Sequence, residues 1–245
     1  DELYRRLETV RAADRRRLKK RLDGLARKFN ANALPKVSAA IDACRETCAH
    51  QGGDFCLALF GENRYHSIMG YSNCVRPHPS NVAPTLMVLD AELAVFKDGQ
   101  TRKLAIRDLY PTNPSAVNAE HTLEPGEIIT AIFVPAMPEG TRSAYVAARE
   151  KQSFDWPATA AAARLTLNGG TISDAAICLG SVAPVPYPVD DAAQFLKGKE
   201  ASVELFKEAA EMAFKAAIPL THNEYKVPLG KATLVDALLQ AAGRS

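Results

Sequence analysis

The hydrophobic positions of the first 29 residues recur with a helical period. They lie at spacings of three, four or multiples near them, which predicts one long amphipathic helix. These positions are Leu3, Leu7, Val10, Leu18, Leu22, Leu25 and Phe29. The other face is basic, because eleven lysines and arginines and only three acidic residues lie between Arg5 and Lys28. We interpret that face as solvated or docked on an acidic partner subunit, with nucleic acid or a membrane as the less favoured alternatives.

The pattern changes after a break at residues 30–35. A shorter helix is expected from about residue 36 to residue 48, followed by a glycine pair. From Pro79 the stretch up to Leu89 indicates a buried helix, "AELAVF" alternates as a strand, "KDGQ" fits a hairpin turn and "RKLAI" returns. The segment "LEPGEIITAIFVP" places a Pro-Gly turn before a β-branched strand that ends at Pro135.

A boundary is expected at residues 137–142, which are rich in proline and glycine. Beyond it we expect a strand in "SAYVAAR", an alanine-rich segment in "PATAAAARLTL", a turn at "NGG" and a second pair of strands in "TISDAAICLGSV". Helices are expected at about 190–198, 202–217 and 231–242.

The order of elements predicts an α+β fold in three parts. These are a helical N-terminal segment over residues 1–42, a middle α/β domain over 43–138 and a C-terminal domain over 139–245. At 245 residues and 47% hydrophobic, the chain can bury a substantial core. Its net charge of +2 gives no reason to expect a surface that binds nucleic acid throughout. No apolar run approaches the ~20 residues that cross a bilayer, so we expect a soluble, cytoplasmic protein.

The clearest candidate chemistry is a group of cysteines. Four of the five lie within one short segment, at Cys44, Cys48, Cys56 and Cys74. Thiolates bind iron-sulfur clusters or zinc, but the spacing matches neither the bacterial ferredoxin run nor a paired CxxC zinc site. An iron-sulfur cluster, zinc and unligated thiols therefore all stay open. His66 or His78 is a candidate to replace one thiolate, although a structural role is simpler for both. Cys178, inside "AAICLGSV", is expected to be a small buried hydrophobic residue.

Common catalytic motifs do not occur in the sequence. There is no HExxH, Walker loop or GxSxG, and Ser80 and Ser181 have no local histidine base.

A longer stretch is recognisable as a whole. The segment "GGDFCLALFGENRYHSIMGYSNCVRPHPSNVAPTLMVLDAELAV" resembles the flavin-binding, medium subunits of molybdenum hydroxylases, a family that includes xanthine dehydrogenase, carbon monoxide dehydrogenase, aldehyde oxidoreductase and 4-hydroxybenzoyl-CoA reductase. The resemblance continues through "LEPGEIITAIFVP", "SFDW", "ICLGSVAPVPYP" and "PLTHNEYKVPLGKATL". It covers about residues 43 to 242.

The resemblance implies a fold and a role. The middle domain should resemble the second half of the flavin-binding domain, and the C-terminal domain should be an antiparallel sheet with helices. Such subunits pass electrons through FAD between an external carrier, such as ferredoxin, and the molybdenum and [2Fe-2S] centres of a molybdopterin-binding large subunit and a small subunit. Tyr225 and Lys226 would then lie at a subunit boundary.

The resemblance also bears on the cysteines. Members similar to 4-hydroxybenzoyl-CoA reductase and the periplasmic aldehyde oxidoreductases carry a [4Fe-4S] cluster bound by four cysteines. Cys48, Cys56 and Cys74 fall on such positions. Cys44 is the proposed fourth ligand, although the family's first cysteine usually lies further upstream.

Three departures from the family pattern change the expectation for FAD. The glycine-rich turns that hold the FAD pyrophosphate have no counterpart before residue 43. The usual Ser-Asp reads Ser80-Asn81, and the usual Tyr-x-Lys near the flavin ring ends in Ala147.

We therefore expect a relay subunit that keeps the cluster and has lost FAD. Asn81, Tyr145 and Trp156 would mark a residual flavin region, with core packing as the simpler role for Trp156. One alternative is an ordinary FAD-binding subunit whose flavin site is completed by another chain. The other is a redox-inactive assembly subunit, with inert or zinc-bound cysteines.

Overall fold

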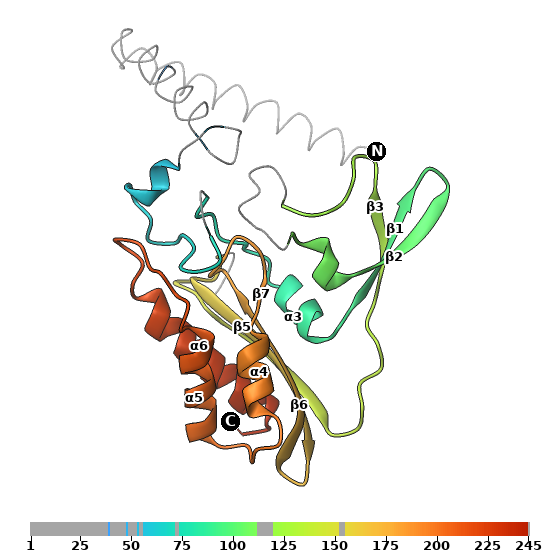
Figure 1. Cartoon of the computed structure of the whole chain (residues 1–245), viewed down its shortest axis with the longest axis vertical. Helices are drawn as coiled ribbons and strands as arrows, with labels where there is room; N and C mark the ends of the chain where they lie inside the picture. Colours follow the sequence, from blue (N-terminus) through green and yellow to red (C-terminus); the bar gives the residue numbers. More distant parts are fainter. Residues whose placement is uncertain are drawn as a thin grey trace, which may run out of the picture. The chain divides into compact units, whose positions relative to one another are not determined.

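The computed structural model describes residues 39, 48, 53, 56–71, 74–111, 120–151 and 155–244 (Figure 1). The helices expected over residues 1–29 and 36–48 fall almost wholly outside these ranges. The described part contains helices and two antiparallel sheets, so the α+β prediction is confirmed.

The first sheet has three strands in the order β2-β1-β3. The strands are β1 (Glu92–Lys97), β2 (Gln100–Ala105) and β3 (Ile128–Phe133). β1 and β2 form the predicted hairpin, and both turn residues, Asp98 and Gly99, have positive φ angles of 49° and 80°. An Asp-Gly pair suits that geometry because such turns follow the natural twist of the strands.

The second sheet has four antiparallel strands in the order β4-β5-β6-β7. The strands are β4 (Thr141–Ala148), β5 (Thr159–Asn168), β6 (Thr171–Gly180) and β7 (Tyr187–Pro188). Gly169 and Gly170 make the tight turn between β5 and β6, with φ angles of 58° and 94°. The predicted strand in "SAYVAAR" is confirmed as β4.

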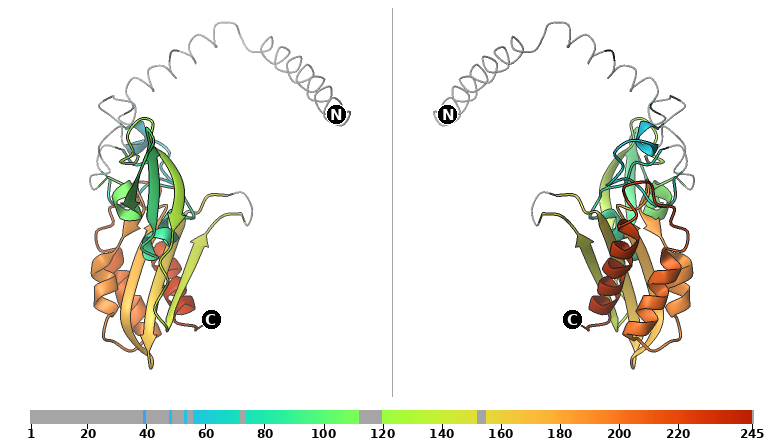
Figure 2. Two further views of the ribbon diagram at one scale, coloured as in Figure 1. Left: turned by 90° about the vertical axis from the view of Figure 1, so that its right-hand side faces the viewer. Right: turned by 90° about the vertical axis from the view of Figure 1, so that its left-hand side faces the viewer.

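The alanine run of β5 is buried on both faces of this sheet. Ala161 and Ala163 belong to a core shared with the C-terminal helices, whereas Ala162 belongs to a second core shared with β1 and α3. The C-terminal helices are α4 (Asp190–Leu196), α5 (Val203–Ala213) and α6 (Lys226–Ala241), and α3 is Ala83–Val88. Figures 1 and 2 show α3 on one side of the sheet and α5 and α6 on the other. Small side chains let all three layers approach closely.

The C-terminal helices lie near their expected positions. α4 and α5 are shorter than predicted, and α6 begins five residues earlier, at Lys226 rather than at residue 231. Ser202 caps α5, since its side chain accepts a hydrogen bond from the backbone N–H of Leu205 over 3.1 Å. No helix in the described part of the chain is long and apolar enough to span a membrane.

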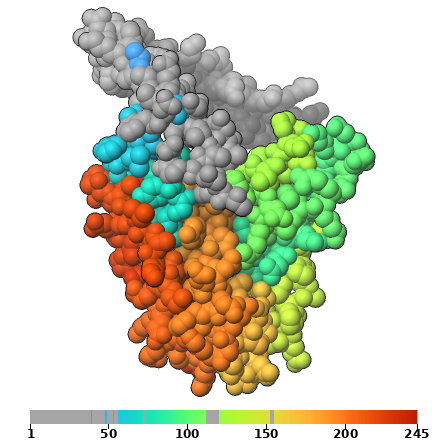
Figure 3. All heavy atoms as spheres, in the orientation of Figure 1, coloured from blue at the N-terminus to red at the C-terminus, as the bar shows by residue number. Residues whose placement is uncertain are grey.

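Arg164 of β5 connects the sheet to the segment after α3. Its Nε donates to the carbonyl of Val88 over 2.6 Å, and its guanidinium pairs with Asp90 and Asp174 at 3.1 Å each. Arg107 pairs with Asp190 at the start of α4. Figure 3 shows the green surface of the smaller sheet next to the orange surface around α4. These contacts hold the smaller sheet beside the larger one.

Replacing Gly230 with alanine tests the packing of α6. Alanine in a helix interior is ordinarily more stable than glycine by about 1 kcal/mol. Here an added Cβ would lie 2.6 Å from Cε1 of buried Phe214 and closer still to its Cζ. We expect Gly230→Ala to lower the free energy of unfolding by about 1–3 kcal/mol in denaturant titrations. Asp236→Ala, at an exposed position of the same helix, should change it by less than about 0.5 kcal/mol. A Gly230→Ala protein as stable as the wild type would contradict this packing.

Candidate functional site

Two residues of the predicted flavin region lie in contact. Asn81 precedes α3 and Tyr145 is in β4. The Tyr145 hydroxyl donates a hydrogen bond to Oδ1 of Asn81 over 2.9 Å, and Nη2 of Arg149 donates to the same oxygen over 3.2 Å. Burial raises the pKa of Tyr145, so its hydroxyl stays protonated. Because side chains alternate along a strand, Tyr145 and Ala147 share one face of β4. Arg149, the residue after the strand, supplies a positive charge that Ala147 lacks.

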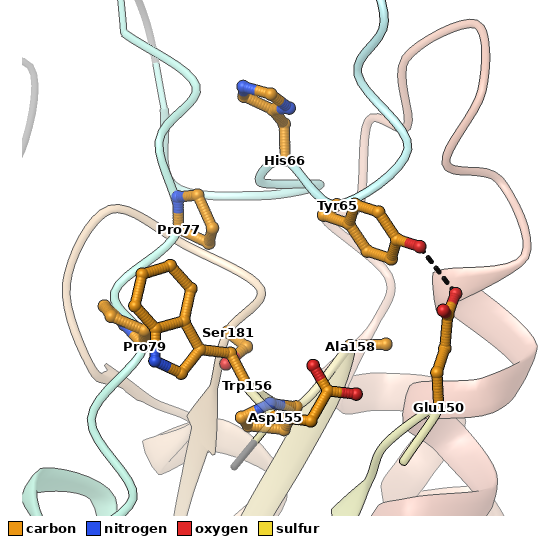
Figure 4. A pocket seen from close by; sticks show the side chains of 10 residues that line it. Tyr65, His66, Pro77, Pro79, Glu150, Asp155, Trp156, Ala158 and Ser181 are labelled. Carbon is orange, nitrogen blue, oxygen red and sulfur yellow. Dashed lines mark hydrogen bonds between the residues drawn. The ribbon is translucent and has the colours of Figure 1, made fainter. Parts of the chain in front are cut away.

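Trp156, the third predicted residue, forms one wall of a pocket of about 400 Å³ (Figure 4). Trp156 is 76% exposed, so the interpretation that placed it in the core is wrong. The walls come from the loop before α3, from the connection between β4 and β5, and from the residue after β6. The lining residues are Tyr65, His66, Pro77, Pro79, Glu150, Asp155, Trp156, Pro157, Ala158 and Ser181. The Tyr65 hydroxyl donates to Oε1 of Glu150 over 2.6 Å and so joins two walls.

Two polar atoms of the lining residues are buried without a hydrogen-bond partner in the described structure. They are Nδ1 of His66 and Oγ of Ser181. Ser181 is only 3% exposed, and its φ of 60° is uncommon for a residue other than glycine. Burial, with a smaller contribution from the charge of Lys226, lowers the pKa of His66, which favours a neutral ring. Buried polar atoms are generally paired, so these two atoms lack an expected partner. The apolar lining with a few polar atoms suits a flat aromatic ligand that carries polar atoms of its own.

A buried lysine holds the same walls together. Nζ of Lys226 donates to the carbonyl oxygens of Ser181, His66 and Tyr65 over 2.7, 2.9 and 3.1 Å. The Lys226 side chain is fully buried, and burial lowers its pKa from 10.5 to about 7. The three carbonyl acceptors oppose that shift because they stabilise the ammonium form. The expectation that Lys226 lies at a subunit boundary is wrong, because its side chain is fully buried within the fold of this one chain.

The predicted metal ligands do not form a site within the described residues. Cys44 lies outside them; Cys48 and Cys56 are half-buried, Cys74 is buried, and all three are free thiols. Among the described residues, no group of three or more Cys, His, Asp or Glu side chains is placed to hold a metal ion. Nη1 of Arg76 donates to Sγ of Cys74 over 3.3 Å. The set of four cysteines therefore stays a prediction.

The remaining candidates from the sequence, Cys178 and His78, are packed against other residues of the fold. Cys178 is 1% exposed, as predicted, and burial raises its pKa. The ring of His78 packs edge-on against Tyr110, with 5.1 Å between centroids. Sequence reasoning missed Lys226 as the residue that orders the pocket. One signal was available: Pro228 suits the first turn of a helix, which places the start of α6 before residue 231.

Comparison with known proteins identifies three matching families. Residues 143–241 match the CO dehydrogenase flavoprotein C-terminal domain, and residues 47–137 match the FAD binding domain in molybdopterin dehydrogenase. Residues 1–50 match the HrpA N-terminal alpha helical hairpin binding domain. The pocket is built from both of the first two matched regions.

Individual relatives agree with these matches. Aldehyde oxidoreductase FAD-binding subunit PaoB of Escherichia coli is 30% identical over 79% of this chain and 58% of its own length. Carbon monoxide dehydrogenase medium chain of Afipia carboxidovorans is 30% identical over 74% of this chain and 62% of its own. The structure of reconstituted CO dehydrogenase from Oligotropha carboxidovorans aligns with a TM-score of 0.60 and 27% identity, covering 69% of this chain and 58% of that one. The chain thus spans about three fifths of the length of these relatives.

Replacing Lys226 tests its role in the pocket walls. We expect Lys226→Met to lower the free energy of unfolding at pH 7 by about 2–4 kcal/mol, because the carbonyls of Tyr65 and Ser181 lose their donor. Lys231→Met, which breaks an exposed pair with Glu211, should cost less than about 1 kcal/mol. Between pH 7 and pH 10 the unfolded chain holds a proton on Lys226 that the folded chain gives up, so the wild type should gain stability relative to Lys226→Met as pH rises. A constant difference across that range would contradict the lowered pKa.

Proposed function

Over residues 47–241 the chain is a relative of the FAD-binding, medium subunits of molybdenum hydroxylases, and we propose that it serves as an electron-transfer and scaffolding subunit of a multi-subunit oxidoreductase of that kind. Its partners would be a molybdopterin-binding large subunit and a [2Fe-2S] small subunit. The large subunit would select the substrate, and ferredoxin or another carrier would exchange electrons with the complex.

The pocket at Trp156 is the observation that carries this proposal. Its apolar lining fits the flat ring system of a flavin, because indole faces stack on aromatic rings. Trp156, Pro77 and Pro79 would contact the faces or edge of the ring, and Ser181 and His66 offer unpaired polar atoms for its heteroatoms. A flavin bound there would supply an acceptor that exchanges electrons with one-electron and two-electron partners.

The contact between Asn81 and Tyr145 is a second feature of the proposed flavin region, although neither residue lines the pocket at Trp156. Asn81 replaces the family's aspartate, so the position keeps a hydrogen-bonding side chain but loses a negative charge. Arg149, which directly follows β4, donates to Asn81. A positive charge at this place would favour a reduced, anionic ring, which is the role expected of the missing lysine.

The pyrophosphate of FAD needs a further element. Such groups are held by backbone N–H groups of glycine-rich turns at helix starts, and we find no turn of that kind in the part of the chain that the structure describes. We propose that another polypeptide segment completes the site. The prediction that FAD binding is lost remains the competing one, and flavin content separates the two.

A [4Fe-4S] relay is the second candidate for how the subunit carries electrons. Cys48, Cys56 and Cys74 are all free, and with Cys44 they would provide the four thiolates that such a cluster needs. The described cysteines alone do not form a three-ligand group, so the cluster ranks second to the flavin pocket.

The single tryptophan makes the flavin pocket directly measurable. Trp156 is the only tryptophan in the chain, so its fluorescence reports on the pocket alone. We expect FAD or lumiflavin to quench it saturably, and Ser181→Ala to weaken binding about threefold to tenfold by removing one polar contact. Ile218→Ala, at an exposed position outside the pocket lining, should bind as the wild type does. Quenching that only follows collisional, unsaturable behaviour would count against a flavin site.

Metal and flavin analysis of the native complex distinguishes the three roles. We expect the protein, purified without oxygen together with its partners, to contain about one flavin per chain. About four irons per chain without flavin would instead support the cluster relay. Absence of both from a chain that still binds its partners would leave only the assembly role.

A further inference from the structure

The pocket at Trp156 has an acidic side. Two of its lining residues, Glu150 and Asp155, carry carboxylates, and both belong to the connection between β4 and β5. Glu150 is exposed and Asp155 is half-buried. Figure 4 shows both side chains on the side of the pocket away from Pro79. A ring bound between the walls would therefore have negative charge along one side.

Hydrogen bonds hold both carboxylates at the pocket. Oε1 of Glu150 accepts from the Tyr65 hydroxyl over 2.6 Å, and Oδ2 of Asp155 accepts from the backbone N–H of Lys151 over 3.0 Å. The bond to Glu150 raises the pKa of Tyr65, so the hydroxyl keeps the proton that it donates. The two negative charges are thus fixed parts of the wall.

The described lining supplies no positive charge to match them, since it contains neither lysine nor arginine. Burial lowers the pKa of His66, its one histidine, which favours the neutral ring. The ammonium group of Lys226 lies behind the wall, where it donates to the carbonyl oxygens of three lining residues. Its charge offsets at most one of the two carboxylates.

Basic residues close to the lining in sequence have partners elsewhere. Arg64 and Arg76 pair with carboxylates that do not line the pocket, at 3.8 and 3.5 Å. Arg149 donates to Asn81, which is also outside the lining. Among the described residues, the surface that a ligand would touch is therefore negatively charged.

We propose that Glu150 and Asp155 make this pocket selective for an uncharged aromatic ring over a ligand that carries phosphate. The inference rests on the proposed flavin site, because it specifies which part of a flavin these walls accept. A phosphate close to the ring would be repelled by both carboxylates, over a range of about 10 Å at 0.1 M salt. The phosphates of FAD would then have to be held by the segment that completes the site.

Riboflavin and FMN differ by one phosphate, so their affinities for the full chain measure this selectivity. We expect quenching of Trp156 to show riboflavin binding about threefold to tenfold tighter than FMN at ~10 mM ionic strength. The ratio should fall below about twofold at ~0.5 M salt, where charges are screened. FMN that binds as tightly as riboflavin at low salt would overturn the inference and leave the flavin site standing. Absence of saturable binding by either ligand would overturn the proposed flavin site as well.

Charge substitutions assign the selectivity to these two residues. Asp155→Asn and Glu150→Gln keep the shape of each side chain and should each bring the affinity ratio closer to one, and Asp155→Lys should reverse the preference. Glu208→Gln is the matched control, because it removes the same charge from an exposed position of α5 outside the lining. Circular dichroism establishes that each variant folds. A ratio that Glu208→Gln changes as much as Asp155→Asn would contradict a local effect of the pocket carboxylates.

Discussion

Burial of β5 on both faces is the constraint on which the rest of the described structure depends. One face meets the core under α4, α5 and α6, and the other meets the core of α3 and β1. A strand in that position needs side chains small enough for two layers to approach it, and alanine provides them. The same arrangement puts Gly180 close to Pro84 and Ala160, where an added Cβ would be only 3.1–3.2 Å from either side chain.

The pocket is a consequence of that layering. Ala158 precedes β5 and Ser181 follows β6, so both lie where the central pair of strands ends. The loop before α3 passes this end of the sheet and is held by backbone hydrogen bonds from Ile68 and Met69 to Val182. The pocket therefore lies where the segments matched by the two domain families meet. A ligand that lies there would contact both.

The sequence predicted those parts of the fold that depend on local pattern. Turn residues and hydrophobic periodicity predict the Asp98-Gly99 hairpin, strand β4 and the last three helices. β5 could not be assigned from its alanines, because alanine favours a helix and only the surrounding layers make it a strand. The sequence placed Asn81 and Tyr145 in one flavin region but did not predict the hydrogen bond between them. The role of Lys226 depends on three carbonyls from distant segments, which no local pattern reveals.

The three hydrogen bonds of Lys226 also bear on how the chain folds. They connect residues separated by 161, 160 and 45 positions in the sequence. An ammonium group leaves water at low cost only when all of its acceptors are in place. The loop at residues 65–66, the turn at Ser181 and the start of α6 should therefore become ordered together. Residues 47–137 and 143–241, the regions that match the two flavoprotein families, would then fold in a single cooperative step. The entropy of closing long loops would slow that step.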